Sequence, residues 1–325
     1  MKLGILGTGM IVKDLMSVYH ELHIEETYIL GTSHTVEETE HIVHEYHLTG
    51  SFYNYDDLLK SQIDTVYCAL PNYLHYTFCK KALEEGKHVI VEKPITSNSQ
   101  ELEELIEIAE QRNVMIFEAM NIHFLPSYLS LKEDLNKLGH IKIVSFNYSQ
   151  YSSRYNAFKE GNILPAFDYH KSGGALMDLN VYNIHALLGL FGKPIDNHYY
   201  ANIERHIDTS GMMIFDYGTF KAITIGAKDC KAPIMNTIQG DKASIVIDTP
   251  MNQMFEYKIN YNDGTTEIKS FEKRHRLIYE FKEFIKMIEN RNFKQQKKML
   301  DLTLEISIIM EKGRKQEGVV FDNDR

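Results

Sequence analysis

The first 120 residues alternate between short apolar segments and amphipathic segments, and this alternation constrains the fold more than any other feature of the chain. The expected strands are 2–6, 28–31, 64–69, 89–91 and 114–117. The expected helices are a segment ending near residue 22, then 36–46, 74–85 and 99–112. Repeated strand–helix units with short connections predict an α/β fold with a doubly wound parallel sheet.

The turn after the first expected strand reads Gly7-Thr8-Gly9-Met10-Ile11. A Gly-x-Gly loop at this point places bare backbone N–H groups at a helix amino terminus, which favours a pyrophosphate. The third small position of the usual pattern holds Val12, which must fit the contact between helix and strand. The loop therefore predicts a dinucleotide site, and the alternative is a tight turn that needs two glycines and binds nothing.

The exit of the second expected strand bears on the choice of cofactor. Enzymes that use NAD carry an acid there for the ribose hydroxyls, whereas this chain has no carboxylate before Glu37. Hydroxyl groups of Thr32, Ser33 and Thr35, together with His34, could accept a 2′-phosphate instead. The segment therefore favours NADP over NAD, although His34 may equally be a plain surface residue.

Lys93 directly follows the charge-free run Val89-Ile90-Val91 and Glu92. Three β-branched residues in succession fit a buried strand of a parallel sheet. A cation at the carboxyl end of such a strand lies where open α/β sheets bind ligands. Pro94 fixes its own φ and restricts Lys93, so the backbone aims the ammonium. The alternative is a surface lysine at a strand exit.

Composition excludes several classes of protein. The chain has 325 residues and a net charge of −10, and a short basic stretch at 294–298 is expected to be the solvated start of a helix, so no nucleic-acid surface is expected. No apolar run reaches the length of a membrane span, and the amino terminus does not resemble a signal peptide. Three widely spaced cysteines without metal-type spacing favour a reducing cytoplasm and no metal site.

The second half supplies strands and a candidate substrate surface. A strand of mixed character is expected at 141–151, and 152–172 forms an aromatic-containing loop that is either functional or simply packed. A helix from near Gly173 carries Asp178 and Tyr182, which share a face at a spacing of four residues. Strands then follow at 199–206, 212–215, 219–225, 235–240 and 244–248, and helices at 277–290 and 298–313 end the chain.

These motifs together resemble the glucose–fructose oxidoreductase, inositol dehydrogenase and MocA-like family of oxidoreductases. The resemblance covers nearly the whole chain and is most specific up to residue 126. The stretches that carry it are Gly7-Thr8-Gly9-Met10-Ile11, Leu70-Pro71-Asn72-Tyr73-Leu74-His75, Glu92-Lys93-Pro94, Glu118-Ala119 leading to Phe124-x-Pro126, and Gly173-Gly174-Ala175-Leu176-Met177-Asp178.

The resemblance implies two domains. Residues 1–120 would be a Rossmann domain that binds NAD(P), and residues 121–325 would be an α/β domain with a large, mainly antiparallel open sheet. The second domain would bind substrate and form homodimers or homotetramers through its sheet. In the first, the loop Leu70-Pro71-Asn72 and His75 would line the nicotinamide side, next to Glu92 and Lys93, with a cis peptide bond before Pro94.

Matching the family residue by residue places Asp178 on its acid and Tyr182 where most members have His. A subset that resembles glucose–fructose oxidoreductase and dimeric dihydrodiol dehydrogenase has Tyr there. Asn180 and Asn183 replace the usual Gly and Pro, and His123 stands where Arg is common. These departures bear on substrate contacts more than on the fold. The alternative for Tyr182 is a helix tyrosine packed at the domain junction.

The sequence therefore predicts an NAD(P)-dependent oxidoreductase acting on a sugar, cyclitol or related polyol or carbonyl compound. Tyr182 would exchange the hydroxyl proton, Lys93 would favour phenolate and stabilise negative charge on the substrate oxygen, and Asp178 would accept hydrogen bonds from hydroxyls. Whether Lys93 or Tyr182 is the immediate proton donor stays open. Two alternatives are an NAD(P)-binding regulator without turnover, and a redox-assisted lyase or glycosidase that retains its cofactor.

Overall fold

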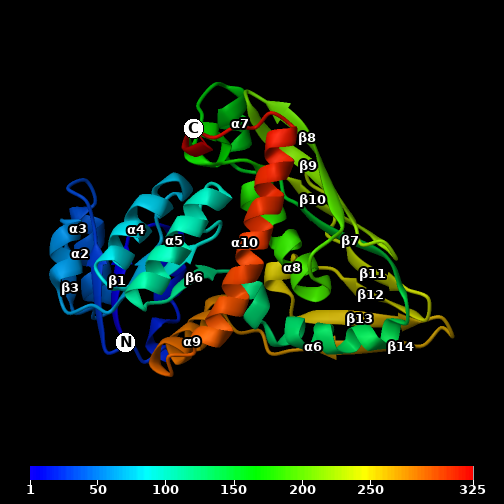
Figure 1. The fold of residues 1–325 in the computed structure, drawn as a ribbon, viewed down its shortest axis with the longest axis horizontal. Coiled ribbons are helices and arrows are strands. Elements are labelled where there is room, and N and C mark those ends of the chain that lie inside the picture. Colours follow the sequence, from blue (N-terminus) through cyan, green and yellow to red (C-terminus); the bar gives the residue numbers. More distant parts are fainter. Residues whose placement is uncertain (325) are drawn as a thin grey trace. The chain divides into compact units, whose positions relative to one another are not determined.

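A computed structural model describes residues 1–324, and these residues form two compact units (Figure 1). The first unit comprises Met1–Ala119 and Leu277–Leu304, and the second comprises Met120–Arg276 and Glu305–Arg325. The first stretch of the first unit ends at Ala119. The expected second domain, 121–325, is not one continuous unit, because Leu277–Leu304 packs with the first. No helix within residues 1–324 is long and apolar enough to cross a membrane.

The first unit contains a six-stranded parallel sheet, as the strand–helix alternation predicts. Its order is β3-β2-β1-β4-β5-β6. Its strands are β1 (Lys2–Leu6), β2 (Glu26–Leu30), β3 (Gly50–Phe52), β4 (Thr65–Cys68), β5 (His88–Glu92) and β6 (Ile116–Ala119). All pairings are parallel, so the loops that follow β1, β2, β4 and β5 lie along the same edge of the sheet.

The helices of this unit are amphipathic and bury one face each. They are α1 (Met10–Met16), η1 (Tyr19–Glu21), α2 (Val36–Glu45), α3 (Tyr55–Lys60), η2 (Asn72–Leu74), α4 (His75–Glu84) and α5 (Ser99–Arg112). The sequence analysis missed β3 and α3, because β3 has only three residues and shows no periodicity. The first helix is also shorter than expected, since it ends at Met16 and a separate turn buries Leu22.

Two carboxy-terminal helices complete the first unit: α9 (Arg276–Glu289) and the beginning of α10 (Phe293–Gln316). The ring centroid of Phe281 lies 5.1 Å from that of Tyr67, and the centroids of Phe284 and Phe117 are 4.8 Å apart. All four rings are at most 2 % exposed. The apolar stripe of α9 is therefore part of the core of the parallel-sheet unit. These contacts join residues that are far apart in sequence, so no local pattern predicts them.

The second unit is built on an eight-stranded sheet in the order β14-β13-β12-β11-β7-β10-β9-β8. Its strands are β7 (Ile141–Ser149), β8 (Asp196–Glu204), β9 (Ile207–Asp216), β10 (Lys221–Ala227), β11 (Asn236–Gly240), β12 (Ala243–Ile247), β13 (Glu256–Tyr261) and β14 (Thr266–Ser270). Only the β7–β10 pairing is parallel, which confirms the large, mainly antiparallel sheet. The sequence analysis did not identify β13 and β14.

The helices of the second unit are mostly short. They are η3 (Asn121–Phe124), α6 (Pro126–Asp134), η4 (Leu135–Leu138), α7 (Tyr155–Lys159), η5 (Pro165–Phe167), η6 (Tyr169–Lys171), η7 (Leu176–Asn180), α8 (Val181–Phe191), η8 (Met251–Gln253) and η9 (Asp322–Asp324). The irregular segment 152–172 contains three of them and packs by its aromatic rings. Phe158 and Phe167 stack with centroids 4.9 Å apart and are almost fully buried.

The segment that carries Asp178 is a π-helix, η7, followed directly by α8 with Tyr182. A spacing of four residues places two side chains on one face only in an α-helix. In this π-helical segment the spacing alone does not show that Asp178 and Tyr182 share a face. Asp208 of β9 holds the start of η7, because its Oδ2 accepts hydrogen bonds from the Leu176 amide at 2.7 Å and from the Tyr199 hydroxyl at 2.8 Å. Isolated π-helical turns occur frequently at functional sites.

Asp208 is 1 % exposed, and its burial raises the pKa of the carboxyl to about 6. A raised pKa means that the Asp208 carboxyl binds its proton more tightly in the folded chain than in the unfolded chain. Its contribution to stability is therefore complete below the ordinary aspartate pKa of about 4 and is lost as pH rises through about 6. We expect the Asp208→Asn variant to lack this part of the pH dependence, because an amide does not titrate.

The measurement is the free energy of unfolding of the wild type and of Asp208→Asn across this pH range. Relative to the variant, the wild type should lose about 3 kcal/mol between about pH 4 and about pH 7. Asp248→Asn, at an exposed position, is the matched control and should follow the wild type. Parallel curves for the wild type and Asp208→Asn would contradict the assignment.

Candidate functional site

The glycine loop has the geometry of a phosphate-binding turn. Gly7 has a φ of 101°, donates its amide to the Leu30 carbonyl at 3.2 Å, and has so little room that an added Cβ would lie 3.1 Å from the Ala69 carbonyl oxygen. Gly9 is the N-cap of α1 without a side-chain cap, and apart from its immediate chain neighbours no described residue lies within 4 Å of the position of its missing Cβ. The uncapped amides and the open space fit a pyrophosphate.

The structure adds an acid to this loop that the sequence analysis missed. The Thr8 hydroxyl donates to Glu38 Oε2 at 2.8 Å, and Lys13 Nζ lies 2.7 Å from Glu38 Oε1. Lys13 first and Thr8 second hold the pKa of Glu38 below its usual value. Glu38 lies in the first turn of α2. A carboxylate at this position, one turn beyond the exit of β2, is the sequence signal that could have identified this acid. The positive charge of Lys13 offsets the negative charge of Glu38 next to the glycine loop.

The exit of β2 forms an open hollow of about 400 Å³ lined by 33–38. Ser33 and His34, the residues expected to meet a 2′-phosphate, are exposed there. Thr32 and Thr35 are less available, because the Thr32 amide donates to Thr35 Oγ1 at 2.9 Å and the two hydroxyls are 3.2 Å apart. These bonds shape the turn and leave Ser33 and His34 on its outside.

His75 occupies a different place from the one expected of a residue that lines the cofactor. Its side chain is fully buried, with Nε2 2.7 Å from the Leu70 carbonyl oxygen and Nδ1 3.0 Å from the Pro94 carbonyl oxygen. Burial lowers the pKa of His75, and the surrounding carbonyls act in the opposite direction. The ring therefore joins the loop after β4 to the loop after β5. Pro71 and Asn72, in contrast, retain exposed surface.

The loop that carries Lys93 is held at its base. The Lys93–Pro94 peptide bond is cis, as the family resemblance implies. Glu92 accepts a hydrogen bond from the Tyr67 hydroxyl at 2.5 Å, and the Ile95 amide donates to Glu118 Oε1 at 3.1 Å. Lys93 itself is half-buried at the carboxyl end of β5. Buried hydrogen bonds on both sides therefore fix the backbone that positions its ammonium.

Further contacts extend this support. The Glu101 amide donates to Asn98 Oδ1 at 2.8 Å, so Asn98 caps the start of α5, and the Ser97 amide donates to Glu101 Oε2 at 3.0 Å. Glu118 also accepts from the Thr303 hydroxyl of α10 at 3.1 Å. The sequence analysis quoted Glu118 only as part of a motif, and its role as the buried anchor of the Lys93 loop was not recognised.

In the second unit, Asp178 pairs with a cation that the sequence analysis did not single out. Lys228 Nζ lies 2.8 Å from Asp178 Oδ2, and the Lys228 side chain is 2 % exposed whereas that of Asp178 is 38 % exposed. Tyr182 is half-buried, with its ring centroid 6.1 Å from that of Tyr148. Asp178 and Tyr182 thus lie on consecutive helical segments of one unit, and the cofactor-binding candidates and Lys93 lie in the other.

Two histidines pack against each other in the second unit. His123 Nε2 lies 3.1 Å from His185 Nδ1, and the His123 ring meets the Tyr128 ring edge-on at 5.8 Å. Burial, followed by the neighbouring His185, lowers the pKa of His123 to about 3. His123 is therefore neutral where the family commonly has Arg. The pair is a packing contact between η3 and α8.

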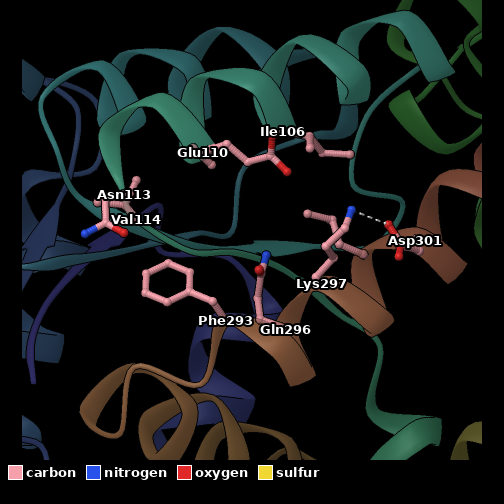
Figure 2. Close-up of a pocket in the computed structure, with 10 residues that line it drawn as sticks. Ile106, Glu110, Asn113, Val114, Phe293, Gln296, Lys297 and Asp301 are labelled. Atoms are coloured by element: carbon pink, nitrogen blue, oxygen red, sulfur yellow. Dashed lines mark hydrogen bonds and ion pairs between the residues drawn. The ribbon is translucent and has the colours of Figure 1, made fainter.

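A partly open pocket is lined by none of these residues (Figure 2). It has a volume of about 190 Å³ and is lined by residues of α5 and α10, including the ion pair of Lys297 with Asp301 at 2.9 Å. Asn113 and Val114, which also line it, precede β6, so the cavity lies at the amino end of that strand. It is smaller than the pockets that usually hold nucleotides.

The described residues 1–324 contain no cluster of three or more His, Cys, Asp or Glu side chains that could hold a metal ion. The candidate site of the first unit consists instead of backbone amides, hydroxyls and one lysine. These are groups that bind a phosphorylated cofactor and a polar substrate without a metal.

Comparison with known proteins agrees with this arrangement. Residues 1–120 match the model of an oxidoreductase family with an NAD-binding Rossmann fold. The scyllo-inositol 2-dehydrogenase (NADP(+)) of Bacillus subtilis strain 168 is 37% identical over 265 residues, which are 81% of this chain and 80% of that protein.

Solved structures share the fold over almost the full length. A 3-ketoreductase from Actinomadura kijaniata in complex with NADP and TDP-benzene gives a TM-score of 0.84 at 18% identity, covering 99% of this chain and 98% of that one. Levoglucosan dehydrogenase in complex with NADH and levoglucosan gives 0.82 at 16% identity, covering 98% of each chain. The glycine loop, the lysine at the end of β5 and the long similarity to the inositol dehydrogenase lead to one conclusion: the chain belongs to the Gfo/Idh/MocA family of oxidoreductases.

Proposed function

We propose that this protein is an NADP-dependent dehydrogenase of a cyclitol or sugar, with scyllo-inositol as the first substrate to test. The observation that carries the proposal is the 37% identity to an NADP-dependent scyllo-inositol 2-dehydrogenase across 81% of the chain. The family assignment supports NAD(P)-dependent hydride transfer in general, and the long relative supports the narrower substrate class and cofactor.

In this proposal the cofactor lies on the loops at the carboxyl edge of the parallel sheet. Its pyrophosphate is held by the loop Gly7-Thr8-Gly9-Met10-Ile11, and its 2′-phosphate by Ser33 and His34. The loop Leu70-Pro71-Asn72 and the Glu92-Lys93 turn hold the nicotinamide side, and His75 supports both of these loops from beneath. When bound, the nicotinamide supplies the hydride donor or acceptor.

The residues of the chain manage the substrate and one proton. Lys93 places a positive charge at the substrate oxygen, where negative charge develops as the hydroxyl loses its proton. The Tyr182 phenolate, which the neighbouring ammonium favours, takes the hydroxyl proton in oxidation, and the resulting phenol returns it in reduction. Asp178 accepts hydrogen bonds from neighbouring substrate hydroxyls. A cytoplasmic location fits this use of a soluble cofactor and a polar substrate, and it belongs to the proposal as well.

Purified protein incubated with NADP+ or NAD+ and a panel of inositols and sugars tests the function directly. We expect reduction of NADP+ by at least one cyclitol, with a higher kcat/KM than with NAD+. Binding of NADPH without turnover of any substrate would favour a regulator. Conversion of substrate without net release of reduced cofactor would favour a lyase or glycosidase. Failure to bind either cofactor at millimolar concentration would overturn the proposal.

The Lys93→Met variant tests the catalytic lysine. Because the charge at the substrate oxygen is lost while the glycine loop is untouched, kcat should fall by at least ~100-fold and the Kd of NADPH should stay near the wild-type value. Lys60→Met removes an exposed lysine of the same unit and should leave both quantities unchanged. An unchanged kcat in Lys93→Met would exclude Lys93 from the mechanism.

The proposed homo-oligomer has its support in the outward face of the eight-stranded sheet. Tyr200, Met212, Ile214 and Ile143 all point outward there and are between 40% and 52% exposed. Tyr200 is the cross-strand neighbour of Met212, so the apolar side chains of β8 and β9 adjoin. A contiguous apolar patch on a sheet is typical of a protein interface. We therefore place the contact between copies on this face.

Met212→Glu combined with Ile214→Glu should dissociate the oligomer, because it buries two carboxylates in an apolar contact. The mass in solution, measured by light scattering after size exclusion, should fall to that of a smaller species. Leu129→Glu, at an exposed position on α6, is the control and should keep the wild-type mass. A wild type that is monomeric, or a double variant of unchanged mass, would count against this interface.

A further inference from the structure

Lys228 is a buried cation that is bonded to several segments of the second unit. It follows β10 directly, and its amide donates to the Thr209 carbonyl at 2.8 Å. Its Nζ donates to the Ala166 carbonyl at 2.6 Å, pairs with Asp178 Oδ2 at 2.8 Å, and lies 4.5 Å from the ring centroid of Phe167. Backbone and side chain are therefore both tied to neighbouring segments.

The two side chains of the ion pair differ in exposure, and this difference decides which of them a ligand can reach. The Lys228 side chain is 2 % exposed and that of Asp178 is 38 % exposed. A buried ammonium is stable only when it is paired and hydrogen-bonded, so Lys228 stays turned inward. The carboxylate is the member that a ligand can reach. An ionised carboxylate only accepts hydrogen bonds, which suits the hydroxyls of a neutral polyol.

Two other acids, Asp208 and Asp229, bond to groups other than the Lys228 ammonium. Asp208 lies in its field, which lowers the pKa of that carboxyl against the larger effect of burial. Its Oδ2 is bound by the Leu176 amide and the Tyr199 hydroxyl. Asp229 accepts hydrogen bonds from the hydroxyls of Thr209 and Ser210. Asp178 is thus the acid to which the Lys228 ammonium is directly bonded.

We propose that Lys228 is a positioning residue of the substrate site, which fixes the Asp178 carboxylate in place and in its ionised form as a hydrogen-bond acceptor for substrate hydroxyls. This inference rests on the proposed role of Asp178 in binding substrate. The Lys228–Asp178 bond ties η7, the π-helical segment, to the end of β10, and it holds Phe167 of η5 under the same ammonium. The cation acts through Asp178 and does not touch the substrate.

The test compares Lys228→Met, Asp178→Asn and the double variant with the wild type, using NADP+ and the best cyclitol from the substrate panel. Loss of one charge-assisted contact should lower kcat/KM at least ~10-fold in Lys228→Met, mainly through KM. The acid limb of the kcat/KM profile should move to higher pH, because a neighbouring cation favours an ionised carboxylate. NADPH affinity should not change.

The double variant distinguishes positioning from general support. If Lys228 acts through Asp178, replacing it in the Asp178→Asn background should cause no further loss of kcat/KM. Lys231→Met, at an exposed lysine three residues further on, is the control and should behave as the wild type. An unchanged kcat/KM and pH profile in Lys228→Met would overturn the proposal. An equal loss in both backgrounds would also overturn it, since the lysine would then act through Ala166 or Phe167 alone.

A substitute variant and a second measurement cover the cases in which Lys228→Met does not fold or the wild type is inactive. If Lys228→Met does not fold, Lys228→Gln replaces it, because its amide can still donate to the Ala166 carbonyl while the charge is lost. If the wild type turns over no substrate, the proposed function fails, and the Lys228 proposal is judged by NMR titration of aspartate carboxyl carbons. The signal missing from Asp178→Asn should titrate at higher pH in Lys228→Met, and an unmoved signal would overturn the inference.

Discussion

Parallel pairing of β1 with β2 and β4, and of β4 with β5, is the constraint on which the cofactor side of this protein depends. Strands that run in one direction deliver their following loops to one edge of the sheet. The glycine loop, the Ser33-His34 turn, the Leu70–His75 segment and the Lys93 loop therefore converge although up to 86 residues separate Gly7 from Lys93. Buried polar side chains then hold these loops: His75 joins two carbonyls, and Glu118 accepts the Ile95 amide.

In the second unit, buried charged side chains rather than strand direction hold the candidate site residue Asp178 in place. Asp208 and Lys228 are at most 2 % exposed, and each is bonded to the helical segment η7 or to the carboxylate it carries. Such groups are costly to bury without partners, so they favour one arrangement of the chain over its near alternatives. A π-helical turn has no strong local preference for its own geometry. Contacts from β9 and β10 are what hold it beside α8.

Much of the fold could be predicted from the sequence because local patterns are strong in the first unit. The run Val89-Ile90-Val91 predicted a buried strand, and the helix expected at 99–112 is α5. Weak patterns were missed: β3 has three residues, and β14 is an edge strand of the large sheet whose one large apolar residue is Ile268. β13 was missed as well, although its apolar residues alternate with polar ones. The packing of Phe281 on Tyr67 joins the two ends of the chain, a contact that no window of sequence contains.

For the candidate site, the sequence by itself determined the residue types and their order along the strands: two glycines at the first turn, no acid between Leu30 and Glu37, a lysine fixed by Pro94, and Asp178 with Tyr182 in one helical region. Only the tertiary structure decided which of these side chains face outward and what holds them. It buried His75, turned Glu38 toward Thr8, and placed Lys228 against Asp178. The physical reason is that burial and charge pairing depend on residues that are distant in sequence, whereas strand and turn preferences are set by neighbours.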